Sequence, residues 1–430
     1  MATGPVAVEI RSYQVGFGDC FLLSFLYEGD KKRHVLIDFG SSRLPGNLKP
    51  SNYMPRVAED IRTVCNGQLH AVVATHRHSD HINGFATDGS CGGAGKIIAE
   101  CHPKVVVQPW TEDPRAATDA QRATRGSNRS KKGFVAGLAS MQRIAEAIVA
   151  MTASPPAAMS ATTVRSLRFI GETNVKNLSA VQNLIAMGKA ATAVWANAGS
   201  PSGLGGVLPG VKVRVLGPPD LTQTGAISSM RSSDPDEFWS MAAGASSGAS
   251  VGIVPPAGRV TGKSTRSLPP EARWFRNQLE RMSSEQLLEI VTALDSQMNN
   301  TSLILLFEVG KKKLLFPGDA QVENWGYALG DAPDAKATKA LLADVDVYKV
   351  GHHGSRNATP KQLFWEGLKK RGPREGERLV TFLSTMPGKH PGVPRPSLVD
   401  ALDQETDLFT TTDLPKGKEM KLCEPITISI

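Results

Sequence analysis

The chain has 430 residues, 40% of them hydrophobic, so it can bury a sizeable core, and its length alone allows two or three domains. Its formal charge of +8 and isoelectric point near 9.2 favour anionic partners such as nucleic acid or another phosphodiester, although many enzymes without such partners are equally basic. No stretch approaches the roughly 20 apolar residues of a membrane span, and no long apolar run follows a basic start, so we expect neither a membrane segment nor a signal peptide. The five cysteines are scattered without a CxxC pair, which argues against a disulfide framework and favours a cytoplasmic setting.

The first 110 residues predict a run of strands interrupted by one helix. Short β-rich segments separated by GFGD and EGDKK predict strands over 6–15, 20–28 and 33–40. Apolar residues at helical spacing predict a helix over 54–65. Buried strands are expected over 69–75, with the sequence LHAVVAT, and over 104–110.

The middle of the chain alternates predicted helices and strands and then changes character. Helices are expected near 134–148 and over 178–188, and strands over 166–170, 192–197 and 211–219. Residues 222–270 are rich in Ser, Gly, Ala and Pro, and helices are expected near 271–281 and 284–297. We therefore expect 222–300 to be an insertion or lid within a single domain that spans 1–430.

The last third predicts a second set of strands. Residues 300–320 predict a hairpin that ends on an aspartate, and residues 344–355 predict a strand that ends on two histidines. A helix, a strand over 378–385, another helix and two short strands are expected to follow. Both halves thus share a hairpin followed by strands that end in metal-ligand residue types, which would suit a duplicated ββα-type sandwich.

The stretch ATHRHSDHINGF (74–85) is the strongest sign of chemistry, because it holds three of the nine histidines within six positions. His76, His78, Asp80 and His81 follow the strand predicted over 69–75, and α/β proteins place their active sites at such strand ends. Imidazole nitrogen and carboxylate oxygen, with one position open for water, are the ligands of catalytic zinc. The density of histidines around an acid argues against a solvated polar turn and predicts part of a two-metal site.

The motif HxHxDH after a hydrophobic strand resembles the signature of the metallo-β-lactamase superfamily, whose fold is an αββα sandwich with metal ions at one edge. Further matches follow in the family's order: VLIDFG (35–40), LLFPGDA (314–320) and YKVGHHGS (348–355). Together with QVGFGDCFLL (14–23) and the pair His390 and Pro391, they resemble the soluble domain of ComEC-type DNA-uptake proteins and its free-standing relatives. The resemblance covers most of 6–110 and 210–430. It implies an α/β fold, the αββα sandwich, with the Ser/Gly/Ala-rich and helical segment inserted.

The resemblance also implies roles for individual residues. The implied ligands of one or two Zn²⁺ ions, with Mn²⁺ as an alternative, are His76, His78, Asp80, His81, Asp319 and His352. Asp80 would also orient or deprotonate the attacking water, Asp319 would bridge the ions, and His390 would contact the substrate or act as a general acid. Supporting or substrate-facing roles fall to Asp19, Asp38, His353 and Ser355. A turn-forming aspartate is the alternative for Asp19, and a structural or solvated histidine is the alternative for His390.

Two points stay open within this resemblance. The sequence does not say which histidine of the HHG motif is the ligand, and His352 is preferred because it comes first after the strand. Most family members also supply a histidine from a third motif, but no histidine lies between His102 and His352. Asp220, after VLGPP, could replace it. Otherwise one metal position has fewer protein ligands.

The expected function is a metal-dependent hydrolase, most simply a phosphodiesterase or nuclease that uses a metal-bound hydroxide. The basic charge and the resemblance both favour nucleic acid or another phosphodiester as the substrate. One alternative is a hydrolase of small phosphodiesters or of other esters or amides, since the fold supports many chemistries. The other alternative is a partner-binding protein with a degenerate metal site.

Overall fold

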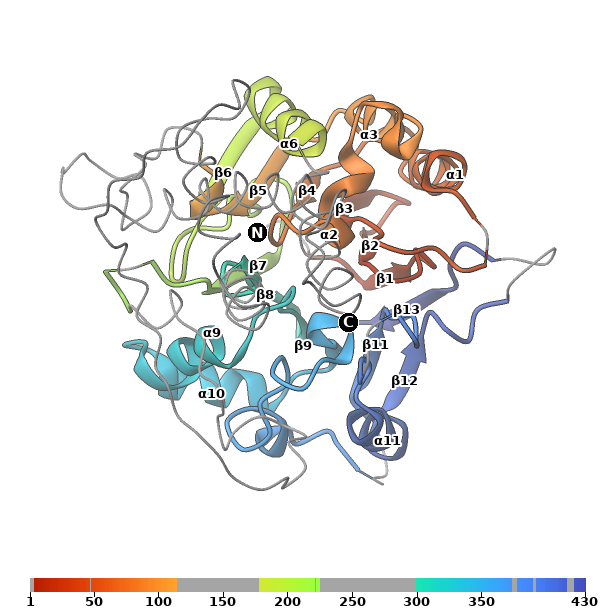
Figure 1. The fold of residues 1–430 in the computed structure, drawn as a ribbon. Helices are drawn as coiled ribbons and strands as arrows, with labels where there is room; N and C mark the ends of the chain where they lie inside the picture. The colour runs from red at the N-terminus through yellow and green to blue at the C-terminus, as the bar shows by residue number, and fades with distance from the viewer. Residues whose placement is uncertain are drawn as a thin grey trace, which may run out of the picture.

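The structure is a computed structural model. It describes residues 4–46, 48–113, 178–220, 222–224, 298–372, 377–389, 392–415 and 421–430. The strands and helices of these ranges form two mixed sheets with helices packed against them (Figure 1).

The first sheet has seven strands, most of them from the N-terminal half. In spatial order they are β13 (Pro425–Ser429), β1 (Ala7–Ser12), β2 (Cys20–Leu26), β3 (Lys32–Phe39), β4 (Ala71–Val73), β5 (Val105–Pro109) and β6 (Thr192–Ala196). The strands from β13 to β3 are antiparallel to their neighbours, and β3 to β6 run parallel. Strand β13, near the C-terminus, therefore forms one edge of the sheet beside β1, with Ala7 opposite Ser429.

The second sheet has six strands, all from residue 211 onward. In spatial order they are β12 (Asp407–Thr410), β11 (Val380–Leu383), β10 (Val347–Lys349), β9 (Lys312–Phe316), β8 (Ile304–Val309) and β7 (Val211–Gly217). Strands β7, β8 and β9 are antiparallel, and β9 to β12 run parallel. The order of antiparallel and then parallel pairings repeats that of β1 to β6.

The two sheets share one apolar core. Alternate side chains of a strand point to opposite faces, so each strand contributes one set to this shared core and the other set to the helices outside. In β8, Leu305 and Phe307 join a cluster with side chains of β1 to β5, whereas Ile304 and Leu306 join a separate cluster with the C-terminal helices. Rings from the two sheets meet in the shared cluster, where Phe21 lies 5.8 Å from Phe316 between ring centroids. The two sheets therefore pack face to face.

Helices cover the outward faces of the sheets (Figure 1). The first sheet is covered by α1 (Pro50–Val64), α3 (Ala94–Ala99) and α6 (Leu178–Ala190). The second is covered by α9 (Val322–Gly326), α10 (Ala335–Ala343) and α11 (Pro396–Glu405). The short helix α2 (Ser79–Ile82) lies instead in the loop after β4. No helix in the described part of the chain has the length and apolar character that a membrane crossing needs.

Most of the predicted elements are confirmed, and so is the α/β class. The strands predicted before residue 111, the helices over 54–65 and 178–188, and the hairpin over 300–320 all correspond to described elements. The helix expected between the HHG motif and the strand at 378–385 is wrong, because the described residues there hold only the 3₁₀ turn η7 (Trp365–Gly367). Glycine and proline punctuate this stretch and oppose a longer helix.

Helices α9 and α10 were not predicted. The predicted elements near 134–148, 166–170, 271–281 and 284–297 lie outside the described residues, as does almost all of the expected insertion at 222–300.

Candidate metal centre

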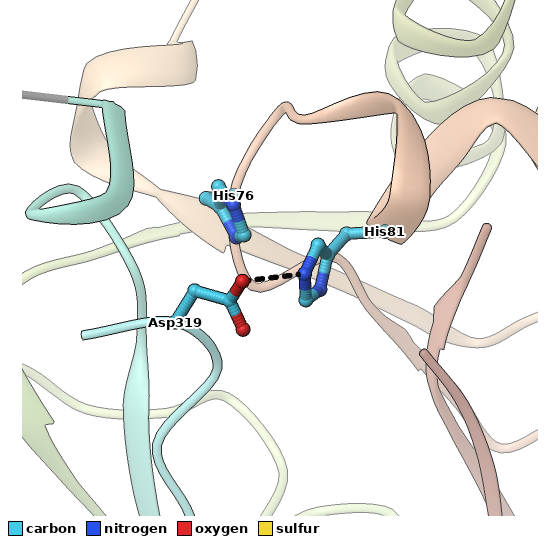
Figure 2. Close-up of side chains that lie close together, drawn as sticks. All are labelled: His76, His81 and Asp319. Atoms are coloured by element: carbon cyan, nitrogen blue, oxygen red, sulfur yellow. Dashed lines mark ion pairs between the residues drawn. The ribbon is translucent and has the colours of Figure 1, made fainter. Parts of the chain in front are cut away.

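The candidate site lies at one shared edge of the two sheets, where strands of both halves end. Asp38 is near the end of β3, and the histidine loop 74–81 follows β4. Asp319 follows β9, and the HHG motif follows β10. Figure 2 shows His76, His81 and Asp319 pointing toward one another from the two halves. Residues far apart in the sequence are thus brought together at strand ends, where α/β proteins place their active sites.

The histidine loop is held in place by backbone contacts. His78 is the N-cap of α2, and its carbonyl accepts hydrogen bonds from the amides of His81 and Ile82 at 3.0 Å. The Asp80 carbonyl accepts a hydrogen bond from the Asp19 amide at 2.8 Å. A Cβ atom at Gly40 would lie 2.5 Å from the backbone of this loop, so only glycine allows the end of β3 to approach so closely.

Four side chains bring potential ligand atoms together, and we call them the four-residue group: Asp80, His81, Asp319 and His353. Nε2 of His81 lies 3.0 Å from Oδ2 of Asp319. Nε2 of His353 lies 3.2 Å from Oδ2 of Asp80 and 3.7 Å from Oδ2 of Asp319. All four residues are at least nine-tenths buried. Two imidazole nitrogens and two carboxylate oxygens therefore face one small volume.

A second pair of ligand atoms lies beside this group, and we call His76 and His78 the histidine pair. Nε2 of His76 lies 3.0 Å from Nδ1 of His78, and the His76 ring lies 4.2 Å from the His81 ring between centroids. Ligand atoms of His76, His81 and Asp319 all lie within 4.8 Å of one another. The structure thus places two groups of possible metal ligands side by side, and His81 belongs to both.

The far side of each ring in the four-residue group is anchored. Nδ1 of His81 lies 2.7 Å from Oδ2 of Asp38, and Nδ1 of His353 lies 3.0 Å from the Ser384 carbonyl oxygen. Asp38 is itself fixed by the amide and hydroxyl of Thr75, each at 2.7 Å. Metal-binding histidines typically donate their other ring N–H to a carboxylate or carbonyl in this way.

The two Nε2 atoms test whether the residues fit a metal. Among the described residues, Nε2 of His81 and Nε2 of His353 are fully buried and make no hydrogen bond of acceptable geometry. Buried polar atoms normally have partners, so each such atom requires an explanation. A cation between these nitrogens and the two carboxylates would satisfy all of them, and the donor set suits Zn²⁺.

Charges inside the site support the same reading. Burial lowers the pKa of His81, but the carboxylates of Asp319 and Asp38 outweigh burial and raise that pKa well above its usual range. Burial raises the pKa of Asp319, but His81 and His353 outweigh it and hold the pKa well below its usual range. The acid therefore stays ionised, and without metal the imidazole holds a proton. Metal binding would replace such protons.

A third cluster of acids, Asp19 and Asp38 with His81, lies on the Nδ1 side of that ring. Protein groups already bind both acids: Asp38 accepts hydrogen bonds from Thr75, and Asp19 forms an ion pair with the buried Lys349 ammonium. Burial lowers the pKa of Lys349, but Asp19 and Asp319 outweigh burial and raise it. We therefore assign this cluster to support of the site and not to metal binding.

The structure separates the two histidines of the HHG motif. Both have positive φ angles, 47° for His352 and 52° for His353, which is unusual for residues other than glycine. The His353 side chain is fully buried in the four-residue group, whereas the His352 side chain is 24% exposed, with Nε2 4.0 Å from Asp319. The choice of His352 as the ligand stays a prediction, and the geometry favours His353.

Other predicted residues lie apart from the centre or outside the described residues. Ser355 directs its hydroxyl to Asn357, at 3.3 Å. Oδ1 of Asp220 accepts hydrogen bonds from Thr222 and Gln223 in its own turn, and Asp220 is in none of the candidate metal groups that the described residues form. His390 lies outside the described residues.

Sequence reasoning missed three supporting residues: Thr75, Lys349 and Ser384. Lys349 left a signal, because it is a single charge within the apolar strand segment VYKV. The signals for Thr75 and Ser384 are weaker, since each is only a small polar residue after a strand.

Comparison with models of protein families finds no match for this chain, and comparison with curated proteins finds none either.

Proposed function

We propose that this chain is a metal-dependent hydrolase of the metallo-β-lactamase type, most simply a phosphodiesterase or nuclease. The motifs in their order along the chain support this assignment. Two face-to-face sheets with helices outside them are what an αββα sandwich requires, and the proposal includes that fold.

One observation carries the proposal. His81 and Asp80 from one half and His353 and Asp319 from the other direct Nε2 and Oδ2 atoms into one buried volume, while both rings are anchored through Nδ1. A solvated polar turn has no need of such anchoring. Nor does a structural ion-pair network need two buried Nε2 atoms that make no hydrogen bond of acceptable geometry within the described part of the chain.

The four-residue group would hold one ion, and the histidine pair together with Asp319 would hold a second with fewer protein ligands. His76 and Asp319 belong to one group of possible ligands, and His78 lies 3.0 Å from His76. Zn²⁺ suits the donors, and Mn²⁺ is the alternative where carboxylate and water ligands dominate. When bound, such ions would supply Lewis acidity and lower the pKa of a coordinated water.

The chain's own residues would orient and shield this centre. Burial raises the pKa of Asp80, but the imidazoles of His353 and His81 outweigh burial and lower it, so the carboxylate stays ionised. Asp38 and the Ser384 carbonyl fix the two rings, which keeps the ligands in place before substrate arrives. A basic chain attracts an anionic substrate, which favours a phosphodiester.

The test compares wild type with Asp80→Ala on labelled single-stranded DNA, duplex DNA, RNA and bis(p-nitrophenyl) phosphate, in separate Mn²⁺ and Zn²⁺ buffers. Asp403→Ala is the matched control, because Asp403 is exposed on α11, away from the site. Cleavage by wild type and the control, but not by Asp80→Ala, is the expected result, and the preferred polymer names the substrate class.

Two other results would move the assignment. Metal binding without cleavage of any of these substrates contradicts a simple nuclease and points to a small ester or amide, or to a required partner. Absence of metal binding contradicts the hydrolase itself and leaves the partner-binding protein with a degenerate site.

A further inference from the structure

A buried lysine lies directly behind the candidate metal centre. Lys349 ends β10, and its side chain is 2% exposed. Its ammonium forms an ion pair with Oδ2 of Asp19, donates to the Gly318 carbonyl at 3.2 Å and lies 3.5 Å from Oδ1 of Asp319. Burying a charge costs hydration free energy, and an ion pair often only offsets that cost. A buried lysine at this place therefore suggests a role other than stability.

The two oxygens of Asp319 have different surroundings. Oδ1 accepts a hydrogen bond from the His352 amide at 3.1 Å and faces the Lys349 ammonium. Oδ2 faces the Nε2 atoms of His81 and His353, at 3.0 and 3.7 Å. One oxygen is therefore held by the protein, and the other is left for a metal.

The backbone of Asp319 is already fixed, so its side-chain rotation is the remaining freedom. Gly318 has φ +55°, and a Cβ atom there would lie 2.8 Å from Cβ of Thr75, so the turn is closely confined. The Asp319 amide donates to the Ser302 hydroxyl at 3.2 Å. A donor beside Oδ1 then decides which way the carboxylate faces.

Asp19 connects this lysine to the other half of the site. Its amide binds the Asp80 carbonyl, and its carboxylate lies 3.6 Å from Nδ1 of His81 and 3.7 Å from Nδ1 of His353. The ion pair between Lys349 and Asp19 therefore joins the end of β10 to the loops that carry the first-half ligands. It lies on the opposite side of both rings from the proposed metal.

We propose that Lys349 is a positioning residue: held by Asp19, it fixes Oδ1 of Asp319 so that Oδ2 faces the metal position in the four-residue group. This inference rests on the proposed function, because it assumes that a metal occupies that position. It assigns Lys349 no contact with substrate and no proton transfer.

Positioning by Lys349 and simple charge repulsion predict opposite changes in metal affinity when the lysine is removed. A positive charge near a bound cation repels it, so removing the lysine by charge alone would tighten metal binding. Loss of positioning would weaken metal binding instead, because Asp319 could turn its second oxygen away. The direction of the change in Kd therefore separates the two.

The experiment measures Zn²⁺ and Mn²⁺ affinity of metal-free protein for wild type, Lys349→Met and the double variant Asp19→Asn with Lys349→Met. The double variant removes one charge of each sign, so it keeps the net charge and leaves no unpaired buried charge. Circular dichroism checks that each variant is folded. Both variants are expected to bind Zn²⁺ about 10- to 100-fold more weakly than wild type, as when a partner of a metal ligand is removed.

Visible spectra of the Co²⁺-loaded proteins give a second readout. A changed ligand field in the folded variants is expected, whereas a merely structural lysine would leave the spectrum of the folded protein unchanged. If Lys349→Met does not fold, the double variant decides the matter alone.

The outcomes are distinguishable. Wild-type affinity, or tighter binding, in the folded variants together with an unchanged Co²⁺ spectrum overturns this inference and leaves the proposed function standing. A wild-type protein that binds neither Zn²⁺ nor Mn²⁺ overturns the proposed function, and this inference with it.

Discussion

The two halves of the molecule use the same strand pattern for different tasks. Strands β1 to β6 and strands β7 to β12 each begin with three antiparallel strands and continue with parallel ones. In both halves the third strand leads to an aspartate, Asp38 or Asp319, and the fourth leads to histidines.

The difference lies in which side of the His81 ring each aspartate occupies. Asp38 binds Nδ1, behind the ring, and Asp319 faces Nε2, where a metal would be. The first half thus supplies the loop 76–81, which carries most of the candidate ligands, and Asp38, which anchors His81. The second half completes the site with Asp319, His353 and the buried ammonium of Lys349. Residues at equivalent places in a repeated pattern can therefore have unequal roles.

The largest expected effect concerns the core that joins the halves. Phe316 of β9 lies edge-on to Phe21 across the sheets and to Phe307 beside it, at 5.8 and 6.0 Å between ring centroids. Phe316→Ala is expected to lower the free energy of unfolding by about 3–5 kcal/mol, through lost burial and a cavity. Urea unfolding measures this. Phe409→Ala, at a ring that is 39% exposed, is the control with a smaller loss. Equal losses in the two variants would contradict a shared core.

The next comparison is between neighbouring histidines of the second half. His353→Ala is expected to lower kcat/KM by more than about 100-fold, beyond what removal of a supporting partner costs, because a proposed metal ligand would be lost. His352→Ala is expected to lower it by less than about 10-fold, since that side chain is partly exposed and farther from Asp319. Steady-state kinetics with bis(p-nitrophenyl) phosphate distinguish them. The reverse order would restore His352 as the ligand.

Equivalent aspartates of the two halves give a sharper test. Asp38→Asn is expected to weaken Zn²⁺ binding by about 10- to 100-fold, because the amide supports the His81 ring less well than the carboxylate. Asp319→Asn should weaken binding more, since it removes a charged ligand atom. Competition with a chromophoric chelator gives both Kd values. A larger loss for Asp38→Asn would mean that the two roles are exchanged.

The smallest effect is expected at the opposite ends of β3 and β4. His34 and His70 lie there with no carboxylate partner among the described residues, and burial lowers the pKa of each to about 4. The unfolded chain therefore binds more protons than the folded chain between about pH 6.5 and pH 4, so stability falls as pH decreases through that window. Urea midpoints across this range should fall less in a His34→Gln, His70→Gln double variant than in wild type. If the urea midpoint depends on pH equally in the double variant and in wild type, the lowered pKa values of these two histidines are contradicted.

Much of the fold was accessible from local pattern. The short, nearly continuous apolar run of a segment such as Ile304–Val309, ILLFEV, indicates burial on both faces and predicts a strand without knowledge of its neighbours. Helix α10, rich in Ala, Lys and Leu, could have been found from helix propensity alone. The pairing of β13 with β1 could not, because a contact between the two ends of the chain leaves no local mark.

The candidate site divides in the same way. The family resemblance implied that the 76–81 loop and Asp319 would meet, and the structure brings them together. Two consecutive residues with positive φ decide which histidine of HHG turns inward, and nothing in the sequence letters indicates that backbone conformation. The pairing of Lys349 with Asp19 depends on burial from both halves and is likewise invisible to local reasoning.

Metal content tests the central claim most directly. Protein purified without any exposure to chelator is analysed for metal by mass spectrometry, before and after incubation with Zn²⁺ or Mn²⁺, for wild type and for Asp319→Ala. The account predicts one to two equivalents of metal per wild-type chain and a clear loss in the variant, since Asp319 belongs to both proposed positions. Well under one equivalent in wild type, with no gain from either ion, would contradict a metal centre built from the two halves.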